Sequence, residues 1–199
     1  MKKEDLIKNL ESQKFPEQIL NAFTVVERED YIPEEFEHEA YANTSLPIGY
    51  GQTISQPYTI AFMLMLLELK DNIKILEVGS GSGYVLDLMN NISKNSEIHG
   101  IERIKDLVDR SKKVLKFKTN IKIIFGDGSK GLIEEAPFDR ILVSATSEKI
   151  PEKLVNQLNY GGILVAPVVN SIVSVKKTYK ENVVKEYPGF VFVPLIESK

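Results

Sequence analysis

Three short motifs place glycine and acidic residues at the ends of apolar runs, where they could bind a nucleotide-like ligand. The first follows the apolar run 73–78 and reads Glu-Val-Gly-Ser-Gly-Ser-Gly over residues 77–83. Glycines at alternate positions let the backbone pass close to a ligand, because no Cβ stands in the way. The candidate binding residues of this motif are Glu77, Gly79, Gly81, Ser82 and Gly83.

The spacing of these glycines separates two classes of cofactor. A dinucleotide-binding turn has the spacing G-x-G-x-x-G, whereas residues 79–83 read G-x-G-x-G, with the acidic Glu77 two positions earlier. This form suits S-adenosylmethionine, which has no pyrophosphate and carries a cationic amino group, and it disfavours a nicotinamide oxidoreductase. A plain Gly-Ser loop is the alternative, but a strand before the turn and a helix after it favour a cofactor site.

The other two motifs follow the next two apolar runs. Glu102 closes the run 97–101, and an acidic residue about 20 positions after a glycine turn can accept hydrogen bonds from ribose hydroxyls. Asp127 could accept a hydrogen bond from an adenine amino group, and the N–H of Gly128 could donate to a ring nitrogen. Alone, each motif could be a surface glutamate or an ordinary Asp-Gly turn. Their order on successive strand ends favours one cofactor site.

Alternating β-branched runs and amphipathic segments predict the elements that position these motifs. We expect strands at 73–78, 97–101, 121–125, 140–144 and 163–168, further strands at 172–178, 183–185 and 190–194 with a turn at Gly189, and helices beginning near Tyr84, Ile104 and Pro151. This alternation predicts an α/β fold with a doubly wound, mostly parallel sheet and helices on both faces. Ligands of such sheets bind beyond the carboxyl ends of the strands, where the strand order reverses.

Residues 1–57 are predicted to form a helical N-terminal extension and an active-site loop, and residues 58–199 the sheet, within one compact domain. Apolar residues at helical spacing predict helices before residue 40. Residues 40–57 are rich in Gly, Pro, Ser and Thr, and we expect a long irregular loop, which is often functional. Ser55 and Pro57 form a helix-start signal before an apolar run, so the helix that follows should be largely buried.

Composition excludes several kinds of chemistry. The 199-residue chain has no cysteine, which excludes thiolates, disulfides and cysteine-ligated metals, and its two histidines, His38 and His99, are too few for most histidine-based sites. We therefore expect no metal. The net charge of −3 disfavours a nucleic-acid partner. Without a membrane-length apolar run or a signal-peptide core, the sequence predicts a cytoplasmic protein, taken here as a monomer, that has no membrane partner.

Over nearly its whole length the chain resembles the protein-L-isoaspartate O-methyltransferases. The most specific part is Ala40-Tyr41 followed by Leu-Pro-Ile-Gly-Tyr-Gly-Gln-Thr-Ile-Ser-Gln-Pro at 46–57. Supporting matches lie at 126–128, 136–139, 151–158, 161–162 and 191–195. The resemblance implies a Rossmann-like S-adenosylmethionine-dependent methyltransferase that starts repair of damaged proteins and peptides. It would methylate the α-carboxylate of their L-isoaspartyl residues and release S-adenosylhomocysteine.

The resemblance also implies roles for particular residues. Ser55 matches the active-site serine of the family, and positions that line the cofactor match Thr53, Ile54, Ser82, Glu102, Arg103, Asp127 and Gly128. A carboxylate acceptor is ionised at neutral pH, so the chemistry needs positioning rather than a strong base. Near a helix N-terminus, the hydroxyl of Ser55 and nearby N–H groups would orient that carboxylate. The alternative is that Ser55 only caps the helix.

The chain departs from its relatives at 167–172, where similar proteins carry Pro-Val-Gly and then a Gln but this chain reads Pro-Val-Val-Asn-Ser-Ile. Residues 144–147 also replace an alanine-rich turn. Two alternatives therefore stay open: methylation of a different carboxylate acceptor, and a non-catalytic relative that only binds the cofactor. An RNA methyltransferase is disfavoured by the acidic balance of the chain and by its lack of an aromatic, basic stripe.

Overall fold

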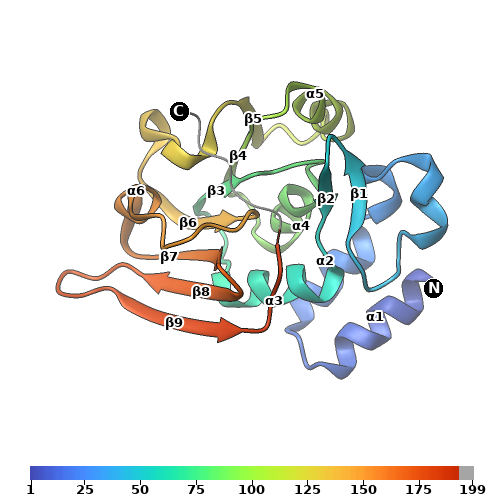
Figure 1. The fold of residues 1–199 in the computed structure, drawn as a ribbon, viewed down its shortest axis with the longest axis horizontal. Coiled ribbons are helices and arrows are strands. Elements are labelled where there is room, and N and C mark those ends of the chain that lie inside the picture. Colours follow the sequence, from blue (N-terminus) through green and yellow to red (C-terminus); the bar gives the residue numbers. More distant parts are fainter. Residues whose placement is uncertain (193–199) are drawn as a thin grey trace.

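The computed structural model describes residues 1–192, and within them a seven-stranded sheet forms the centre of the molecule (Figure 1). The strands are β3 (Lys74–Val78), β4 (Glu97–Glu102), β5 (Ile121–Phe125), β6 (Phe138–Val143), β7 (Leu158–Val168), β8 (Ser171–Lys176) and β9 (Val183–Pro188). Every neighbouring pair from β5 to β7 is parallel, whereas β8 is antiparallel to both β7 and β9. The predicted mostly parallel sheet is confirmed.

The order of the strands reverses beside β3. The sheet order is β5-β4-β3-β6-β7-β8-β9, so the chain moves outward from β3 to β5 and then returns to the other side of β3 as β6. No connection fills the crevice above the carboxyl ends of two strands whose connections leave in opposite directions. The fold therefore places a ligand site above the ends of β3 and β6.

Helices cover both faces of the sheet, as predicted. They are α1 (Lys3–Ser12), α2 (Glu17–Val25), α3 (Pro57–Leu67), α4 (Tyr84–Ile92), α5 (Lys105–Val114) and α6 (Glu152–Asn156), with short 3-10 helices η1 (Arg28–Tyr31), η2 (Glu34–Glu39), η3 (Gly128–Lys130) and η4 (Ile133–Glu135). Buried residues of α1 to α5 share one hydrophobic core, and α6 contributes Leu154 and Val155 to a second. Among the described helices, none is long and apolar enough to cross a membrane.

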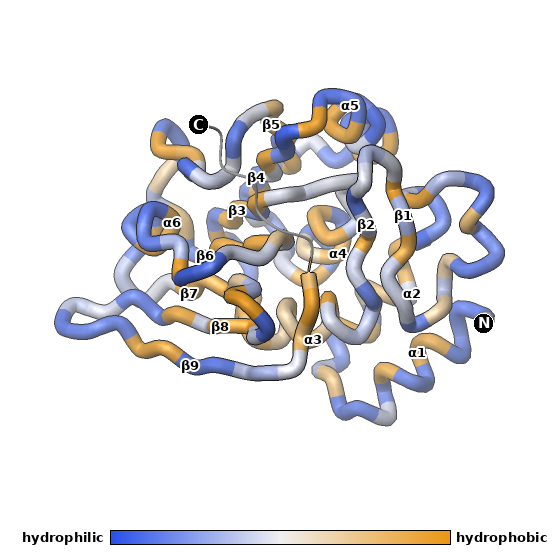
Figure 2. Tube along the Cα trace, viewed as in Figure 1, coloured by the Kyte–Doolittle hydropathy of each residue, from blue (hydrophilic) through white to orange (hydrophobic). Residues whose placement is uncertain are grey.

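Local sequence explains the character of these helices. Helix α3 starts at Pro57, as predicted, and buries most of its residues because its side chains are apolar nearly all round. Helix α1 alternates hydrophilic and hydrophobic residues along its length (Figure 2) and buries only Leu6 and Leu10. Helix α1 is therefore amphipathic and packs its apolar side against the rest of the chain.

Two predictions about local structure were wrong. Residues 40–57 are not an irregular loop, because β1 (Leu46–Gly49) and β2 (Gln52–Ile54) pair as an antiparallel hairpin. The strands are too short, and too rich in Pro and Gly, to give a strand signal in sequence. Phe190 to Phe192 lie outside any strand, since the chain turns at Gly189, whose N–H donates to the carbonyl of Asn170. Residues 193–195, where that strand and the C-terminal family match were predicted to continue, lie outside the described residues.

A buried hydrogen bond anchors the N-terminal extension to the sheet-covering helices. The hydroxyl of Tyr31 in η1 donates to the Asp87 carboxylate of α4 over 2.7 Å, and both side chains are buried. Lys118 lies 3.0 Å from the other carboxylate oxygen of Asp87. The contact joins the segment before the hairpin to the helix that follows the glycine-rich turn.

Replacing Tyr31 with Phe should lower the free energy of unfolding by about 1–3 kcal/mol, because it leaves a buried carboxylate one hydrogen bond short. Urea denaturation would measure the loss. Tyr160→Phe is the control, since Tyr160 is 58% exposed, and its cost should stay within about 0.5 kcal/mol. Equal losses in the two variants would contradict an anchoring role for Tyr31.

Candidate active site

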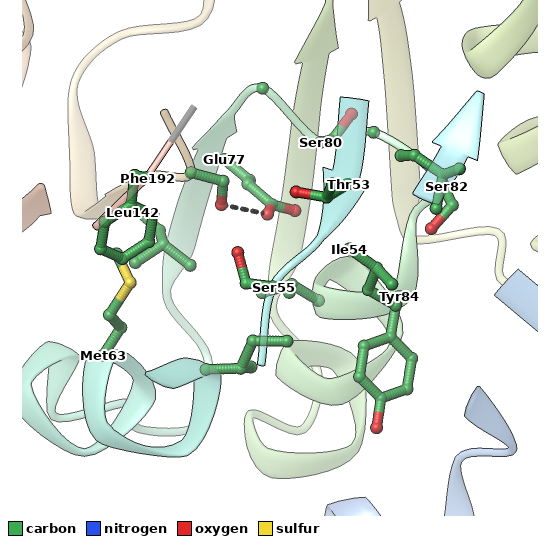
Figure 3. A pocket seen from close by; sticks show the side chains of 16 residues that line it. Thr53, Ile54, Ser55, Met63, Glu77, Ser80, Ser82, Tyr84, Leu142 and Phe192 are labelled. Carbon is green, nitrogen blue, oxygen red and sulfur yellow. Dashed lines mark hydrogen bonds between the residues drawn. The ribbon is translucent and has the colours of Figure 1, made fainter. Parts of the chain in front are cut away.

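A cavity that is open to solvent lies in the crevice above β3 and β6 (Figure 3). The hairpin β1–β2, the glycine-rich turn after β3, helix α3 and the end of β6 all contribute to its lining. The predicted site residues that line it are Thr53, Ile54, Ser55, Glu77, Gly79, Gly81 and Ser82. Residues far apart in the sequence therefore meet where the strand order reverses.

The glycine-rich turn adopts a backbone that its glycines permit. Gly79, Gly81 and Gly83 have φ angles of +79°, +52° and +89°, which side-chain-bearing residues rarely adopt. A Cβ on Gly81 would also lie 3.1 Å from Ile48 of the hairpin. Gly83 does not line the cavity; a Cβ there would lie 2.9 Å from Leu115 beyond α5, so this glycine serves packing.

Glu77 is the most unusual charged group in the cavity. Its side chain is 1% exposed, and one carboxyl oxygen accepts a 2.7 Å hydrogen bond from the hydroxyl of Ser144, across the crevice at the end of β6. Its other oxygen, Oε2, has no hydrogen-bond partner among the described residues. Burial raises the pKa of Glu77 to about 8. A cationic ligand group would give this oxygen a partner and favour the ionised carboxylate, so the site fits the amino group that the sequence predicted.

Ser144 lines the cavity and was not assigned a role from the sequence. Its only local signal is its position as the last residue of the expected strand 140–144, at the edge where ligands bind. Its partner Glu77 lies 67 residues away in the sequence. Only the pairing of β3 with β6 brings the two side chains together.

Glu102 shapes the turn from behind and does not line the cavity. One carboxylate oxygen accepts from the N–H of Gly81, and the other accepts from the N–H of Ile104, both over 2.9 Å. The carboxylate therefore holds the glycine-rich turn against the end of β4. Each oxygen keeps a second lone pair, so its predicted contact with ribose hydroxyls stays a prediction.

The remaining predicted cofactor residues continue along the same edge of the sheet. Asp127 follows β5 and accepts a 3.0 Å hydrogen bond from the N–H of Ser129. A Cβ on Gly128 would lie 2.6 Å from Val78, so this glycine lets the β5 loop approach the end of β3. Arg103 is exposed. None of these three lines the cavity, and their predicted roles toward the cofactor stay predictions.

A second cavity adjoins the first on the hairpin side. Its lining residues are Thr44, Ser45, Thr53, Ser55, Gln56, Thr59, Val191 and Phe192, of which Thr53, Ser55 and Phe192 also line the first cavity. Ser55 thus stands at the junction of the two. The described lining of this second cavity offers several hydroxyl groups and no charged side chain.

Ser55 is not the helix cap that one reading of the sequence expected. The cap of α3 is Gln56, which makes no side-chain capping hydrogen bond. The hydroxyl of Ser55 has no hydrogen-bond partner in the part of the chain that the structure describes, and it points toward the cavity (Figure 3). It is therefore available to a ligand. Its own carbonyl accepts from the guanidinium of Arg28 over 3.1 Å, a residue the sequence reasoning missed because 27–30 reads as an ordinary charged surface segment.

A separate cluster lies at the amino ends of the strands. Ligand atoms of Glu97, His99 and Glu135 lie within 4.8 Å of one another, and His99 is fully buried. Lys74 is 3.0 Å from Glu135, and Lys122 is 2.7 Å from Glu97, so lysines already pair with both carboxylates. This cluster lies at the opposite edge of the sheet from the cavity, and the absence of a metal from the reaction stays a prediction.

Comparisons with known proteins agree on one family. The model of the protein-L-isoaspartate(D-aspartate) O-methyltransferase family matches residues 1–199. The chain is 40% identical to the protein-L-isoaspartate O-methyltransferase of Ignicoccus hospitalis, covering 100% of this chain and 99% of the relative. It is also 40% identical to the protein of the same name from Methanococcoides burtonii, covering 96% and 98%.

Solved structures show the same fold. A Plasmodium falciparum structure, presented as a protein-L-isoaspartate O-methyltransferase in complex with S-adenosyl-L-homocysteine, is 29% identical with a TM-score of 0.84, covering 98% of both chains. Another structure named as a protein-L-isoaspartate O-methyltransferase has a TM-score of 0.89 at 23% identity, covering 97% of this chain and 65% of the other. This latter likeness supports the fold alone.

The raised pKa of Glu77 makes the stability of the protein depend on pH. Folded Glu77 keeps its proton up to about pH 8, whereas in the unfolded chain it loses it near pH 4.5. Between these values unfolding releases a proton, so the contribution of Glu77 is complete below pH 4.5 and is lost as pH rises through 8. Between the two pKa values, the free energy of unfolding falls by about 1.4 kcal/mol for each unit by which the pH rises.

Glu77→Gln carries no such proton, so its unfolding free energy should rise relative to the wild type between pH 6 and pH 8. Guanidinium denaturation of both proteins at each pH would measure the difference. If the two stabilities run parallel across that range, Glu77 does not titrate with a raised pKa.

Proposed function

The chain belongs to the protein-L-isoaspartate(D-aspartate) O-methyltransferase family, and we propose that the cavity above β3 and β6 is where it methylates the α-carboxylate of L-isoaspartyl residues. The observation that carries this proposal is the shared cavity itself. A Glu77 oxygen and the hydroxyl of Ser55, neither of which has a hydrogen-bond partner among the described residues, face it from the sheet and from the hairpin (Figure 3). S-adenosylmethionine, when bound, supplies an electrophilic methyl group and leaves as S-adenosylhomocysteine.

The donor side of the cavity is acidic and rich in glycine. We assign the amino group of S-adenosylmethionine to Glu77 Oε2, because this buried oxygen has no partner within residues 1–192 and would attract a cation. Gly79, Gly81 and Ser82 give the ligand close access to the backbone. The other residues assigned to the cofactor are Thr53, Ile54, Gly83, Glu102, Arg103, Asp127 and Gly128.

The acceptor side offers hydroxyl groups and no charge. An isoaspartyl carboxylate arrives ionised at neutral pH, so no residue has to remove a proton from it. A cationic side chain would hold the carboxylate tightly and make it a poorer nucleophile, whereas the hydroxyl of Ser55 can donate one hydrogen bond and direct it. Alignment of this kind lowers the barrier by several kcal/mol.

We assign the two parts of the chain separate roles. Residues 1–57 would supply the acceptor side through the hairpin, which also contributes Thr53 and Ile54 to the cofactor, and residues 58–199 would supply the rest of the donor side through the sheet. We propose that the protein acts as a monomer in the cytoplasm on isoaspartyl proteins and peptides. Its net charge of −3 argues against nucleic acid or an anionic membrane as its partner.

Two synthetic peptides that differ at one linkage would test the proposed activity. One carries a normal aspartyl residue and the other an L-isoaspartyl residue, and each is incubated with methyl-labelled S-adenosylmethionine. We expect base-labile label on the isoaspartyl peptide only. If neither peptide is labelled although calorimetry shows that S-adenosylhomocysteine binds, the proposed activity is wrong. The protein then methylates a different acceptor or only binds the cofactor.

Ser55→Ala should lower kcat for the isoaspartyl peptide by about 10- to 100-fold, because a misaligned carboxylate loses much of the benefit of positioning. The dissociation constant of S-adenosylhomocysteine should stay within about twofold, since Glu77 and the glycine-rich turn are unchanged. Ser12→Ala, at the exposed end of α1, is the matched control and should keep full turnover. If Ser55→Ala has the same kcat as the wild type, Ser55 has no role in the mechanism.

A further inference from the structure

Arg28 of η1 is a buried cation whose described hydrogen bonds all go to the backbone. Its side chain is 0% exposed, and its two terminal nitrogens donate to carbonyl oxygens on both sides of the hairpin. The acceptors are Ala40 at 3.2 Å, Ala42 at 3.2 Å, Thr44 at 3.0 Å and Ser55 at 3.1 Å. One guanidinium therefore holds the chain that enters β1 and the chain that leaves β2.

No carboxylate compensates this charge in the described structure. The neighbouring Glu27 lies 2.9 Å from Lys3 and accepts from the hydroxyl of Tyr41, and Arg28 forms no ion pair among the described residues. Burial lowers the pKa of the guanidinium to about 10, so it stays protonated at neutral pH. An unpaired buried charge is costly, and here the converging carbonyl dipoles must offset that cost.

This arrangement couples the charge to backbone geometry. A guanidinium is a planar fork of donors, and a lysine ammonium cannot reproduce it. Nη2 alone joins Thr44 to Ser55, both of which line the second cavity. The carbonyl carbon and the Cβ of Ser55 are both bonded to its Cα, so a shift of this stretch of chain away from Arg28 would break the hydrogen bond and would displace the Ser55 side chain with it.

We propose that Arg28 is a positioning residue for methyl transfer, fixing the Ser55 carbonyl and thereby aiming the Ser55 hydroxyl into the cavity. The proposal rests on the proposed function of that cavity. Arg28 does not line either cavity that Ser55 lines, so it acts through Ser55 and makes no contact with substrate. A displacement of 1 Å at a reacting group can cost about 100-fold in rate.

The chain offers a matched control in Arg140. This side chain is 7% exposed, and its guanidinium also donates to backbone carbonyls, at 3.1 and 3.0 Å to Glu68 and at 2.8 Å to Asp139. It lies near the start of β6, at the edge of the sheet opposite the cavity. Removing it should reproduce the stability cost of a lost carbonyl clamp without touching Ser55.

The experiment compares Arg28→Lys with Arg140→Lys in the full chain, at a temperature where circular dichroism shows both folded. We expect Arg28→Lys to lower kcat for the isoaspartyl peptide at least about tenfold, with the S-adenosylhomocysteine dissociation constant within about twofold of wild type. Arg140→Lys should lower the melting temperature and leave kcat unchanged. Hydrogen exchange should accelerate across residues 40–56 in Arg28→Lys only.

Equal kcat values in wild type and Arg28→Lys, or equal losses in the two variants, would overturn the proposal. If Arg28→Lys does not fold, Arg28→Gln, which buries no charge and keeps two N–H donors, takes its place. If neither folds while Arg140→Lys does, Arg28 supports the whole fold and the positioning role is wrong. Wild-type inactivity on the isoaspartyl peptide would overturn the proposed function instead, and the exchange comparison would still test the clamp on Ser55.

Discussion

The hairpin that carries Ser55 depends on one buried cation that has no counter-ion among the described residues. Strands β1 and β2 have four and three residues, and a two-stranded hairpin of that length is marginal by itself in water. Arg28 holds both of its ends by their carbonyls. Arg110 of α5 donates to the carbonyl of Ile48 over 3.0 Å, and Ile48 packs close to Gly81. The hairpin is therefore held at its base and along its length, and these contacts also hold Thr53 and Ser55 in position.

In the function proposed for this cavity, its two sides have opposite electrostatic requirements. The donor side would have to attract a cation, and Glu77 would do so: burial raises the pKa of its carboxyl group, and a nearby positive charge would favour the ionised form. The acceptor side must receive an anion without stabilising it too strongly, because only interactions that strengthen in the transition state accelerate the reaction. Hydroxyl groups would meet that requirement, and the described hydrogen bonds of Arg28 all go to backbone carbonyls.

The segment in which this chain departs from its relatives lies at the same edge of the sheet. Val169 occupies the turn between β7 and β8 with a φ of +54°, a conformation that is costly for a β-branched residue. The N–H of Val169 donates to the carbonyl of Ser147 over 2.9 Å, and the N–H of Ser147 donates to that of Pro167. The turn is thus tied to the loop that begins at Ser144, the partner of Glu77. The departure therefore lies close to the donor side, while the hairpin that carries Ser55 keeps the family motif.

The sequence by itself determined the fold class, the strand ends that carry Glu77 and Glu102, and the start of α3 at Pro57, because periodicity and glycine spacing are local properties of the chain. It did not reveal the hairpin, whose short Pro- and Gly-containing strands have no local signal and are held by contacts with distant residues. The sequence also did not reveal Ser144 or Arg28. Ser144 donates its hydrogen bond to Glu77 on a neighbouring strand, and Arg28 has the local pattern of a surface charge. Only the tertiary structure decided that Arg28 is buried beneath Ser55, because the burial of a charge depends on which segments converge around it.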